Sequence, residues 1–387
     1  MSFDDKKLKS FASDSAYLFT TILPLVLSMA VCSGFGVTSA IFASAIACLL
    51  VTFNKTKMIM PVFTTYLLVS FTFKEYGAST AAAAIALSGA AMIALAFLGF
   101  DFKQIVFKPV TIAIMLASAV TVTVLETTLY FGIGATGNTV DMMINSYRSL
   151  GFHPNWRGIL FGTIVLVLMI TYPRKFKKTD KIIRAPFVAL ALVLALNLIL
   201  NPADMISPIK EIGAYTFDFK GVFLPSFKSK LDLIGVLTSG LAIFFTTAYS
   251  VAEFKGTNLD YAVTGAVNCV CSAFSGSFIP VTSQTYKRKN YAGIPAAILC
   301  VAVLLLCGKF IARIPVSACA VVLIVGAWQS VKWGEIKKAF IDVPSLSCFI
   351  AVTAFMLLFG AVKGILFGAL CSFICSFLPS AKHFIND

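Results

Sequence analysis

Long apolar stretches dominate the chain, and short polar clusters with glycine, proline and charged residues separate them. An apolar stretch of about 17–25 residues spans the hydrocarbon core of a bilayer, where it must form a helix or part of a closed barrel. The stretches lack alternation of apolar and polar positions, so the pattern predicts helices. We predict up to fourteen membrane segments, at residues 17–33, 36–53, 59–73, 79–99, 107–131, 158–173, 183–200, 232–252, 259–275, 279–290, 292–308, 314–330, 344–361 and 363–379.

Composition supports a polytopic α-helical membrane protein. Hydrophobic residues make up 59% of the chain and charged residues 12%, whereas a soluble domain has about 45–50% and about a quarter. The polar stretch 1–15 precedes many membrane segments, which argues against a cleaved signal peptide. The net charge of +14 suggests nucleic-acid binding, but the chain has no domain-sized soluble stretch to form such a surface. We therefore expect no nucleic-acid partner.

The basic residues instead predict the topology. With a cytoplasmic N-terminus, 21 of the 31 lysines and arginines fall on the inner side, and four of the other ten lie in the 201–231 connection. This bias predicts that both termini are cytoplasmic, in the plasma (inner) membrane. The basic loop 174–184 is a further candidate for contact with anionic lipid head groups.

Seven segments in each half produce two repeats of opposite orientation, a common plan in transporters. We assign residues 1–16 to a cytoplasmic N-terminal segment, 17–200 to the first repeat, 201–231 to an outer connection, 232–380 to the second repeat and 381–387 to a cytoplasmic tail.

A weak sequence similarity between the two halves supports the two repeats. Residues 59–65 (IMPVFTT) open the short third segment, and residues 278–284 (FIPVTSQ) open the short tenth segment. Proline is tolerated in the first turn of a helix, so each Pro-Val predicts an extended strand that enters a helix near the middle of the membrane. The alternative is that Pro61 and Pro280 merely kink ordinary membrane helices, which is common.

Two such helix starts would face each other and form an anion site. Each presents unpaired N–H groups and about half a positive charge, so no lysine or arginine is required. Hydroxyl groups of these segments add donors. The predicted binding residues are Pro61, Val62, Phe63, Thr64, Thr65, Ile279, Pro280, Val281, Thr282 and Ser283.

The remaining polar and ionisable residues give weaker indications of function. Lys287, at the inner end of the tenth segment, is a candidate vestibule charge, and it serves equally well as a topology-setting cation. Glu126 and Glu253 lie near segment ends, so strong proton or sodium coupling lacks an obvious carboxylate. The ten cysteines lie mostly in apolar runs without metal-ligand spacing, which indicates helix packing. We expect no metal, no cofactor and no catalytic cluster, and hence no enzyme.

Several runs resemble the SulP-type anion transporters, the solute carrier family 26. The run 314–328 (IPVSACAVVLIVGAW), continued by 333–337 (WGEIK), is similar to the family's twelfth-segment signature. Weaker matches are 107–110 (FKPV) at the start of the fifth segment, 224–227 (LPSF) before the eighth, and 278–282 (FIPVT) at the tenth. Lys287 matches a position that usually holds arginine. The similarity covers about residues 18–380.

The resemblance implies a seven-plus-seven inverted-repeat fold. Segments 1–4 and 8–11 would form a core that moves as an elevator against a gate of segments 5–7 and 12–14. It implies anion binding between segments 1, 3, 8 and 10. This adds Pro24 to Ser28 as a first-segment wall of the site, and Thr247 and Ser250 of the polar, uncharged eighth segment as binding residues. Relatives are often dimers, so a homodimer is a candidate assembly.

Two departures from the family pattern change the expectation. Many relatives carry a cytoplasmic STAS domain after the last segment, whereas this sequence ends at Asp387; we expect a member without that domain or a truncated chain. Bacterial relatives often have an acidic residue in the eighth segment, where this chain has Ser250, with Glu253 one turn away. Exchange or uniport is therefore favoured over sodium or proton symport.

The sequence thus predicts a secondary transporter of small anions such as sulfate, bicarbonate, chloride or a dicarboxylate. A nucleobase permease of the same fold is the alternative, although the carboxylates expected in segments 8 and 10 are missing. A channel-like or motor-like relative is a further alternative. Which anion is transported, and by which coupling, stays open.

Overall fold

The computed structural model describes residues 5–33, 36–51, 62–99, 102–132, 141, 144–145, 148, 154–200, 231–253, 256–273, 292–340 and 343–377. The elements of this part are helices: α1 (Asp5–Ser33), α2 (Val37–Val51), α3 (Val62–Tyr76), α4 (Ala78–Leu98), η1 (Phe102–Ile105), α5 (Lys108–Tyr130), α7 (Trp156–Lys175), α8 (Lys177–Asp180), α9 (Ala185–Leu200), α10 (Leu233–Glu253), α11 (Asn258–Ser272), α12 (Gly293–Ile311), α13 (Val316–Ser330), α14 (Trp333–Ala339), α15 (Val343–Phe359) and α16 (Ala361–Ser376).

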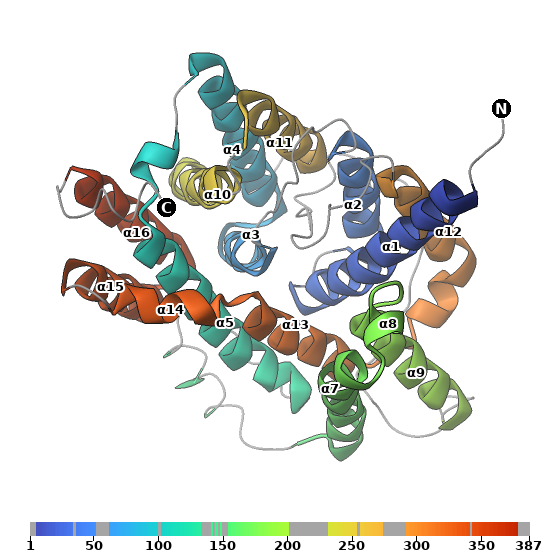
Figure 1. The fold of residues 1–387 in the computed structure, drawn as a ribbon. Helices are drawn as coiled ribbons and strands as arrows, with labels where there is room; N and C mark the ends of the chain where they lie inside the picture. The colour runs from blue at the N-terminus through green and yellow to red at the C-terminus, as the bar shows by residue number, and fades with distance from the viewer. Residues whose placement is uncertain are drawn as a thin grey trace.

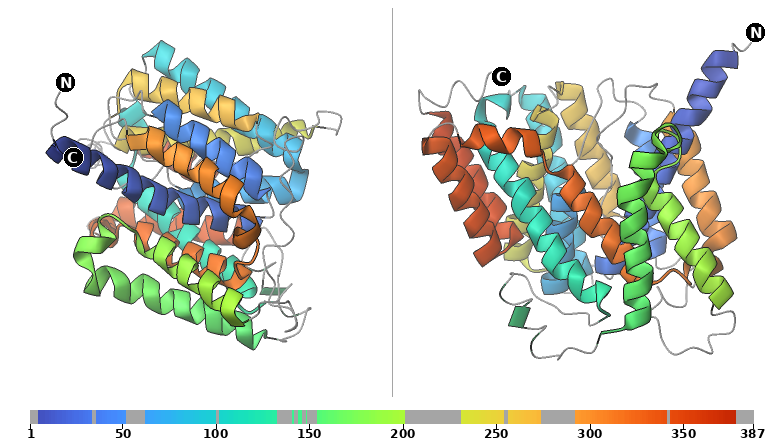
Figure 2. Two further views of the ribbon diagram at one scale, coloured as in Figure 1. Left: turned by 90° about the vertical axis from the view of Figure 1, so that its right-hand side faces the viewer. Right: turned by 60° about the horizontal axis from the view of Figure 1, so that its bottom comes forward.

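Thirteen predicted segments have a matching helix, and the tenth, 279–290, lies outside the described residues. Six of the described helices are long and apolar enough to cross a membrane. The 15 residues of α3 span only about 22 Å, less than the roughly 30 Å of a hydrocarbon core. One boundary differs clearly, since α1 begins at Asp5 instead of residue 17. The helix continues through a polar stretch that hydropathy does not register, and this end projects from the bundle (Figure 2).

The helices pack in two groups (Figure 1). In the core group, α4 packs against α10 and α11, and α2 packs against α1, α11 and α12. In the gate group, α5 packs against α13, α15 and α16, and α7 packs against α9 and α13. Each group therefore combines helices from both halves of the chain. The contacts of α1 with α13 and of α3 with α5 join the groups.

Two glycines bring the core helices α4 and α11 into backbone contact. A Cβ atom built on Gly89 would lie 2.6 Å from the carbonyl oxygen of Gly265, and one built on Gly265 would lie 2.5 Å from that of Gly89. Beside this crossing, the Asn268 side chain donates a hydrogen bond of 3.3 Å to the Ser88 hydroxyl. Small residues let membrane helices approach closely, where van der Waals packing holds them together.

Single glycines form two of the turns between consecutive helices. Gly77, between α3 and α4, has φ 87° and ψ 173°, and Gly360, between α15 and α16, has φ 90° and ψ 165°. These backbone conformations are almost confined to glycine because a Cβ atom would clash with the backbone. Each glycine thereby reverses the chain with a single residue between two helices.

The connection between α4 and α5 contacts both groups. The Phe102 ring lies 5.9 Å from that of Phe244 and 5.5 Å from that of Tyr249, both on α10 of the core group. From α16 of the gate group, the Ser372 hydroxyl donates to the Ile105 carbonyl oxygen at 2.5 Å and accepts from the Phe107 N–H at 2.8 Å. This connection therefore ties the start of α5 to α16 while its aromatic ring packs on the core.

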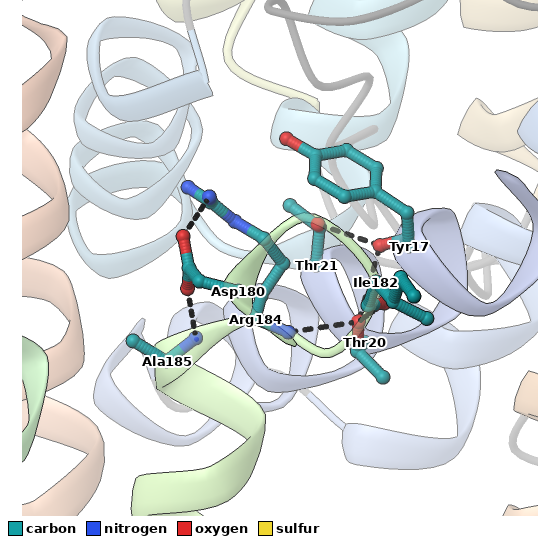
Figure 3. Close-up of polar contacts among 7 residues, drawn as sticks. All are labelled: Tyr17, Thr20, Thr21, Asp180, Ile182, Arg184 and Ala185. Carbon is teal, nitrogen blue, oxygen red and sulfur yellow. Dashed lines mark hydrogen bonds and ion pairs between the residues drawn. The ribbon is translucent and has the colours of Figure 1, made fainter. Parts of the chain in front are cut away.

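A second junction joins α1 to the loop between α8 and α9 (Figure 3). The Arg184 N–H donates to the Thr20 hydroxyl at 3.2 Å, and the Arg184 guanidinium lies 5.3 Å from the Tyr17 ring centroid. Asp180 accepts from the Arg184 guanidinium at 2.6 Å and from the Ala185 N–H at 3.0 Å. Asp180 thus satisfies an N–H in the first turn of α9, and Arg184 holds this loop against the core.

The outer helix faces are apolar. Large hydrophobic side chains stand exposed on several helices, including Phe97 (86%), Leu306 (80%) and Ile199 (74%). Single exposed hydrophobic residues are normal in soluble proteins, but here they recur along helices of membrane-spanning length. They are the lipid-facing surface that a bilayer protein requires.

Candidate functional site

The first turn of α3 lies at the interface of the two groups. The described part of this helix begins at Val62, and Pro61 lies outside the described residues. The first four N–H groups of a helix have no partner within it, and with the predicted start at Pro61 these are the N–H groups of the turn that holds Phe63, Thr64 and Thr65. Phe63, Thr64 and Thr65 are all buried. The turn therefore presents its positive end inside the protein and not to bulk water.

A partly open hollow adjoins this turn. Its walls come from α3, from α10 of the core group and from α5 of the gate group, and its volume is about 310 Å³ including the part open to solvent. The lining residues are Thr64, Thr111, Ile114, Met115, Thr246, Tyr249 and Ser250. Among these described residues the polar groups are hydroxyls, and there is no carboxylate, lysine or arginine.

Most of these hydroxyl groups already donate to their own helices. Thr246 donates to the Ala242 carbonyl oxygen at 2.8 Å, Ser250 to that of Thr246 at 2.9 Å, and Thr111 to that of Lys108 at 2.7 Å. A hydroxyl has one proton to donate. These three groups therefore offer the hollow only their lone pairs.

Thr64 differs because its partner is another hydroxyl group. The oxygen atoms of Thr64 and of Ser118 on α5 lie 3.0 Å apart, and either one can be the donor. Two hydroxyls in one hydrogen bond share two protons, so one proton remains available to a ligand. Together with the α3 N–H groups and the Tyr249 hydroxyl, this pair supplies donors in the described part of the site.

Other described residues that the sequence predicts for the site do not line the hollow. The Thr65 hydroxyl is buried with no hydrogen-bond partner among the described groups, and Thr247 donates to the Ile243 carbonyl oxygen at 2.7 Å. Pro24 and Ser28 are buried within α1. Phe63 packs against the gate, since a Cβ atom on Gly326 of α13 would lie 2.6 Å from its ring.

The opposite wall of the predicted site lies outside the described residues. This applies to the second helix start and the vestibule charge, namely Ile279, Pro280, Val281, Thr282, Ser283 and Lys287, and to Pro61. Of Val62 only the backbone is described. The prediction that two helix starts face one anion therefore stays a prediction.

The sequence reasoning missed the contribution of the gate. Thr111, Ile114 and Met115 on α5 line the hollow, and their only signal was the preceding Lys-Pro pair that opens this helix. It also undervalued Glu126, which is fully buried on α5 and accepts a hydrogen bond from Tyr66 of α3. Neither contact is encoded in local hydropathy.

Nothing in the described part of the chain assembles a metal site. No three histidine, cysteine, aspartate or glutamate side chains gather there in a way that could hold a metal ion.

No protein-family model matches the chain, and no curated protein matches it in sequence. Solved structures with a similar fold include the transmembrane domain of a cyanobacterium bicarbonate transporter, BicA, with 16% identity, a TM-score of 0.72, and coverage of 96% of this chain and 98% of that one. Another is the overall structure of SLC26A9, with 12% identity, a TM-score of 0.74, and coverage of 96% and 66%.

The murine Slc26a9 anion transporter in its inward-facing state is a third such structure, with 10% identity, a TM-score of 0.77, and coverage of 96% of this chain and 69% of that one. Identities this low show the fold alone. The predicted fold class is thereby confirmed: the chain has the seven-plus-seven inverted-repeat fold, with core and gate, of these transporters' membrane portions.

Proposed function

We propose that this protein is a secondary transporter of small anions and that the anion binds at the N-terminal end of α3. The observation that carries the proposal is the hollow between the two helix groups, which the first turn of α3 adjoins and hydroxyl groups line. BicA is a bicarbonate transporter and murine Slc26a9 an anion transporter, so structures with this fold serve anion transport in other proteins.

The physical chemistry of the site favours an anion over a cation. The end of α3 carries about half a positive charge and unpaired N–H groups. The Thr64–Ser118 pair adds one free hydroxyl proton. Donors that are already in place replace part of the hydration shell of an anion and so lower the cost of removing it from water. The described lining holds no carboxylate to attract a cation or to accept hydrogen bonds from a nucleobase.

The arrangement of the helices supports alternating access by movement of the core against the gate. The hollow lies beside the first turns of α5, where Thr111, Ile114 and Met115 line it. Elsewhere along the same interface the groups touch through Phe63 with Gly326 and through Tyr66 with Glu126. The interface thus combines a hollow with closed contacts, and we propose that an alternating-access cycle exchanges the two. We further propose that Thr282 and Ser283 of the tenth segment complete the site.

The substrate and coupling follow from the same features. A site built from backbone N–H groups and hydroxyls lacks the geometry of an arginine fork and suits compact anions: sulfate, bicarbonate, chloride or a dicarboxylate such as oxalate. Without a carboxylate in the described lining, we propose exchange or uniport and not sodium symport. Both termini face the cytoplasm in this proposal, in line with the positive-inside bias.

The test is uptake by the full chain in proteoliposomes. Radiolabelled sulfate, bicarbonate, oxalate and uracil are offered separately, with and without a sodium or proton gradient and with or without an anion inside. We expect uptake of at least one anion, without a requirement for sodium. Uptake of uracil and of no anion would overturn the proposal in favour of the nucleobase permease.

Single substitutions then test the site. Thr64→Val removes the hydroxyl whose proton the Thr64–Ser118 pair can offer. A hydrogen bond to a charged group contributes about 1.5–3 kcal/mol, so we expect the KM for the anion to rise about tenfold or more. Ser250→Ala should have a small effect, because the Ser250 hydroxyl donates to its own helix.

Thr171→Val on α7 is the matched control. Its hydroxyl is exposed and donates to the Val167 carbonyl oxygen at 2.7 Å, away from the hollow. An unchanged KM in Thr64→Val, or an equal rise in Thr171→Val, would contradict the role of the α3 terminus.

A further inference from the structure

A carboxyl group is enclosed between the two helix groups, away from the hollow. Glu126 on α5 of the gate group has no exposed surface. Its Oε1 atom accepts a hydrogen bond of 2.5 Å from the Tyr66 hydroxyl on α3 of the core group. Its Oε2 atom is buried and has no hydrogen-bond partner among the described groups. The hydrogen bond from Tyr66 to this carboxyl group thus bridges core and gate.

Among the described residues, the groups that face this carboxyl offer it no cationic partner. On α1 the Cys32 thiol lies against it, and on α13 the Cys319 thiol lies nearby. On α3 the groups that act on it electrostatically are Tyr66 itself and Lys74. Lys74 lies two turns further on, is exposed and makes no ion pair with Glu126 in the described part of the chain, and Glu75 and Tyr76 follow it at the end of the helix. A carboxylate removed from water without a cation is strongly disfavoured over the neutral acid. We therefore expect Glu126 to hold a proton while the interface is closed.

The position of Glu126 along the interface decides when this proton can leave. The residues of α5 that line the hollow, Thr111 to Met115, precede Glu126 by 11 to 15 residues, or about 16–22 Å along the helix. The hollow and the Glu126 contact thus lie at separate places along the interface. In an alternating-access cycle the Glu126 end must open while the hollow end closes. That movement takes Tyr66 away with the core, admits water and lets the carboxyl group ionise.

We propose that Glu126 and Tyr66 form a proton-binding site that couples closure of this end of the interface to proton uptake. The site rests on the proposed transport function, since it needs the core to move against the gate. Closure binds one proton from the solution on that side, which is the outer side in the predicted topology, and opening returns it to the same side. The transporter therefore senses the pH on that side without carrying protons across.

The sign and size of the effect follow from linkage. The closed state binds one proton more than the open state over the pH range in which the exposed carboxyl group is ionised. Raising the pH by one unit there shifts the equilibrium towards the open state by at most about tenfold, the limit for one proton. Glu126→Gln keeps a neutral side chain of similar size in both states, so the equilibrium should lose this pH dependence.

A first experiment measures the proton directly, without transport. Difference infrared spectra of the full-length purified protein, recorded between two pH values, report the carbonyl stretch of protonated carboxylic acids. We expect a band from a protonated acid that persists at neutral pH in the wild type, is absent in Glu126→Gln and is retained in Glu75→Gln. Glu75 is an exposed carboxylate at the end of α3 and serves as the matched control. Equal spectra for the wild type and Glu126→Gln would overturn the proposal.

A second experiment measures anion uptake into proteoliposomes while the pH is varied on one side at a time. We expect the wild-type rate to depend on pH on one side, Glu126→Gln to lose that dependence, and Tyr66→Phe to keep it because the carboxyl group remains. A Glu126→Gln protein with the wild-type pH profile would overturn the proposal. So would anion accumulation driven by a proton gradient that Glu126→Gln abolishes, since this shows net proton transport. If the wild type transports no anion, the proposed function fails while the infrared result still decides the proton site.

Discussion

The close crossing of α4 and α11 leads to a quantitative prediction for Gly265→Ala. The new Cβ atom would lie 2.5 Å from the Gly89 carbonyl oxygen, 2.7 Å from Cγ1 of Ile93 and 2.9 Å from its backbone nitrogen. Two of these atoms belong to the backbone of α4 and cannot rotate away. Reaching ordinary van der Waals contact requires the helices to separate by about 1 Å, a gap that forfeits a quarter to a half of the dispersion energy of the contacts around it.

The two opposing contributions can be compared. Overpacking typically costs about 1–3 kcal/mol, and the backbone position of the clash puts this substitution at about 3 kcal/mol. Alanine has a higher helix propensity than glycine by about 1 kcal/mol. We therefore expect Gly265→Ala to destabilise the protein by about 2 kcal/mol. The matched control is Gly334→Ala on α14, where a Cβ atom meets nothing within 4 Å. There the higher helix propensity of alanine acts without a clash, so the protein should become more stable.

The measurement is the thermal unfolding midpoint of the detergent-solubilised full chain, followed by the fraction that remains monodisperse in size-exclusion chromatography. Gly89→Ala should behave like Gly265→Ala, because its Cβ atom would lie 2.6 Å from the Gly265 carbonyl oxygen. The double variant should cost clearly less than the sum, since one separation of the helices relieves both clashes. A midpoint for Gly265→Ala at or above that of the wild type would refute this reasoning.

Three further substitutions test other parts of the fold by the same thermal assay. Asp180→Ala should cost about 1 kcal/mol and Asp180→Asn less, because asparagine still caps the start of α9; equal losses would contradict the capping role. Gly77→Asn should cost about 1–3 kcal/mol, because the backbone conformation of Gly77, with φ 87° and ψ 173°, is almost confined to glycine. Gly99→Asn should be tolerated, because Gly99 has φ 64° and ψ 18°, a left-handed conformation that asparagine can adopt. Similar unfolding midpoints for the two variants would argue against this distinction. Thr123→Val removes the acceptor of the Trp328 indole N–H at 2.8 Å and should cost about 1 kcal/mol; an unchanged midpoint would show that this bond adds nothing.

Part of the described hollow could be anticipated from the sequence. The Pro-Val pair at 61–62 predicted a helix over the residues that follow, and α3 is described from Val62 onward, while the prediction that Pro61 starts it stays a prediction. Two of the hydroxyl residues predicted to bind the anion, Thr64 and Ser250, line the hollow. The different hydrogen bonds of these two hydroxyl groups could not be anticipated. The Ser250 hydroxyl donates to its own helix, whereas the Thr64 hydroxyl is hydrogen-bonded to that of Ser118. Only the packing of α3 on α5 creates the contact with Ser118.

The sequence by itself determined that the chain forms membrane helices and where thirteen of them lie, because hydropathy and helix breakers are local properties that a lipid solvent enforces. Only the tertiary structure decided which helices touch. The glycines that let α4 meet α11 and the carboxyl group of Glu126 that meets Tyr66 join residues far apart in the chain. In the sequence, Glu126 is an acid near the end of a segment. Packed between core and gate, it is a fully buried carboxyl group with no cation beside it in the part of the chain that the structure describes. The burial of a side chain depends on how the helices assemble, so the hydropathy of the segment alone does not predict it.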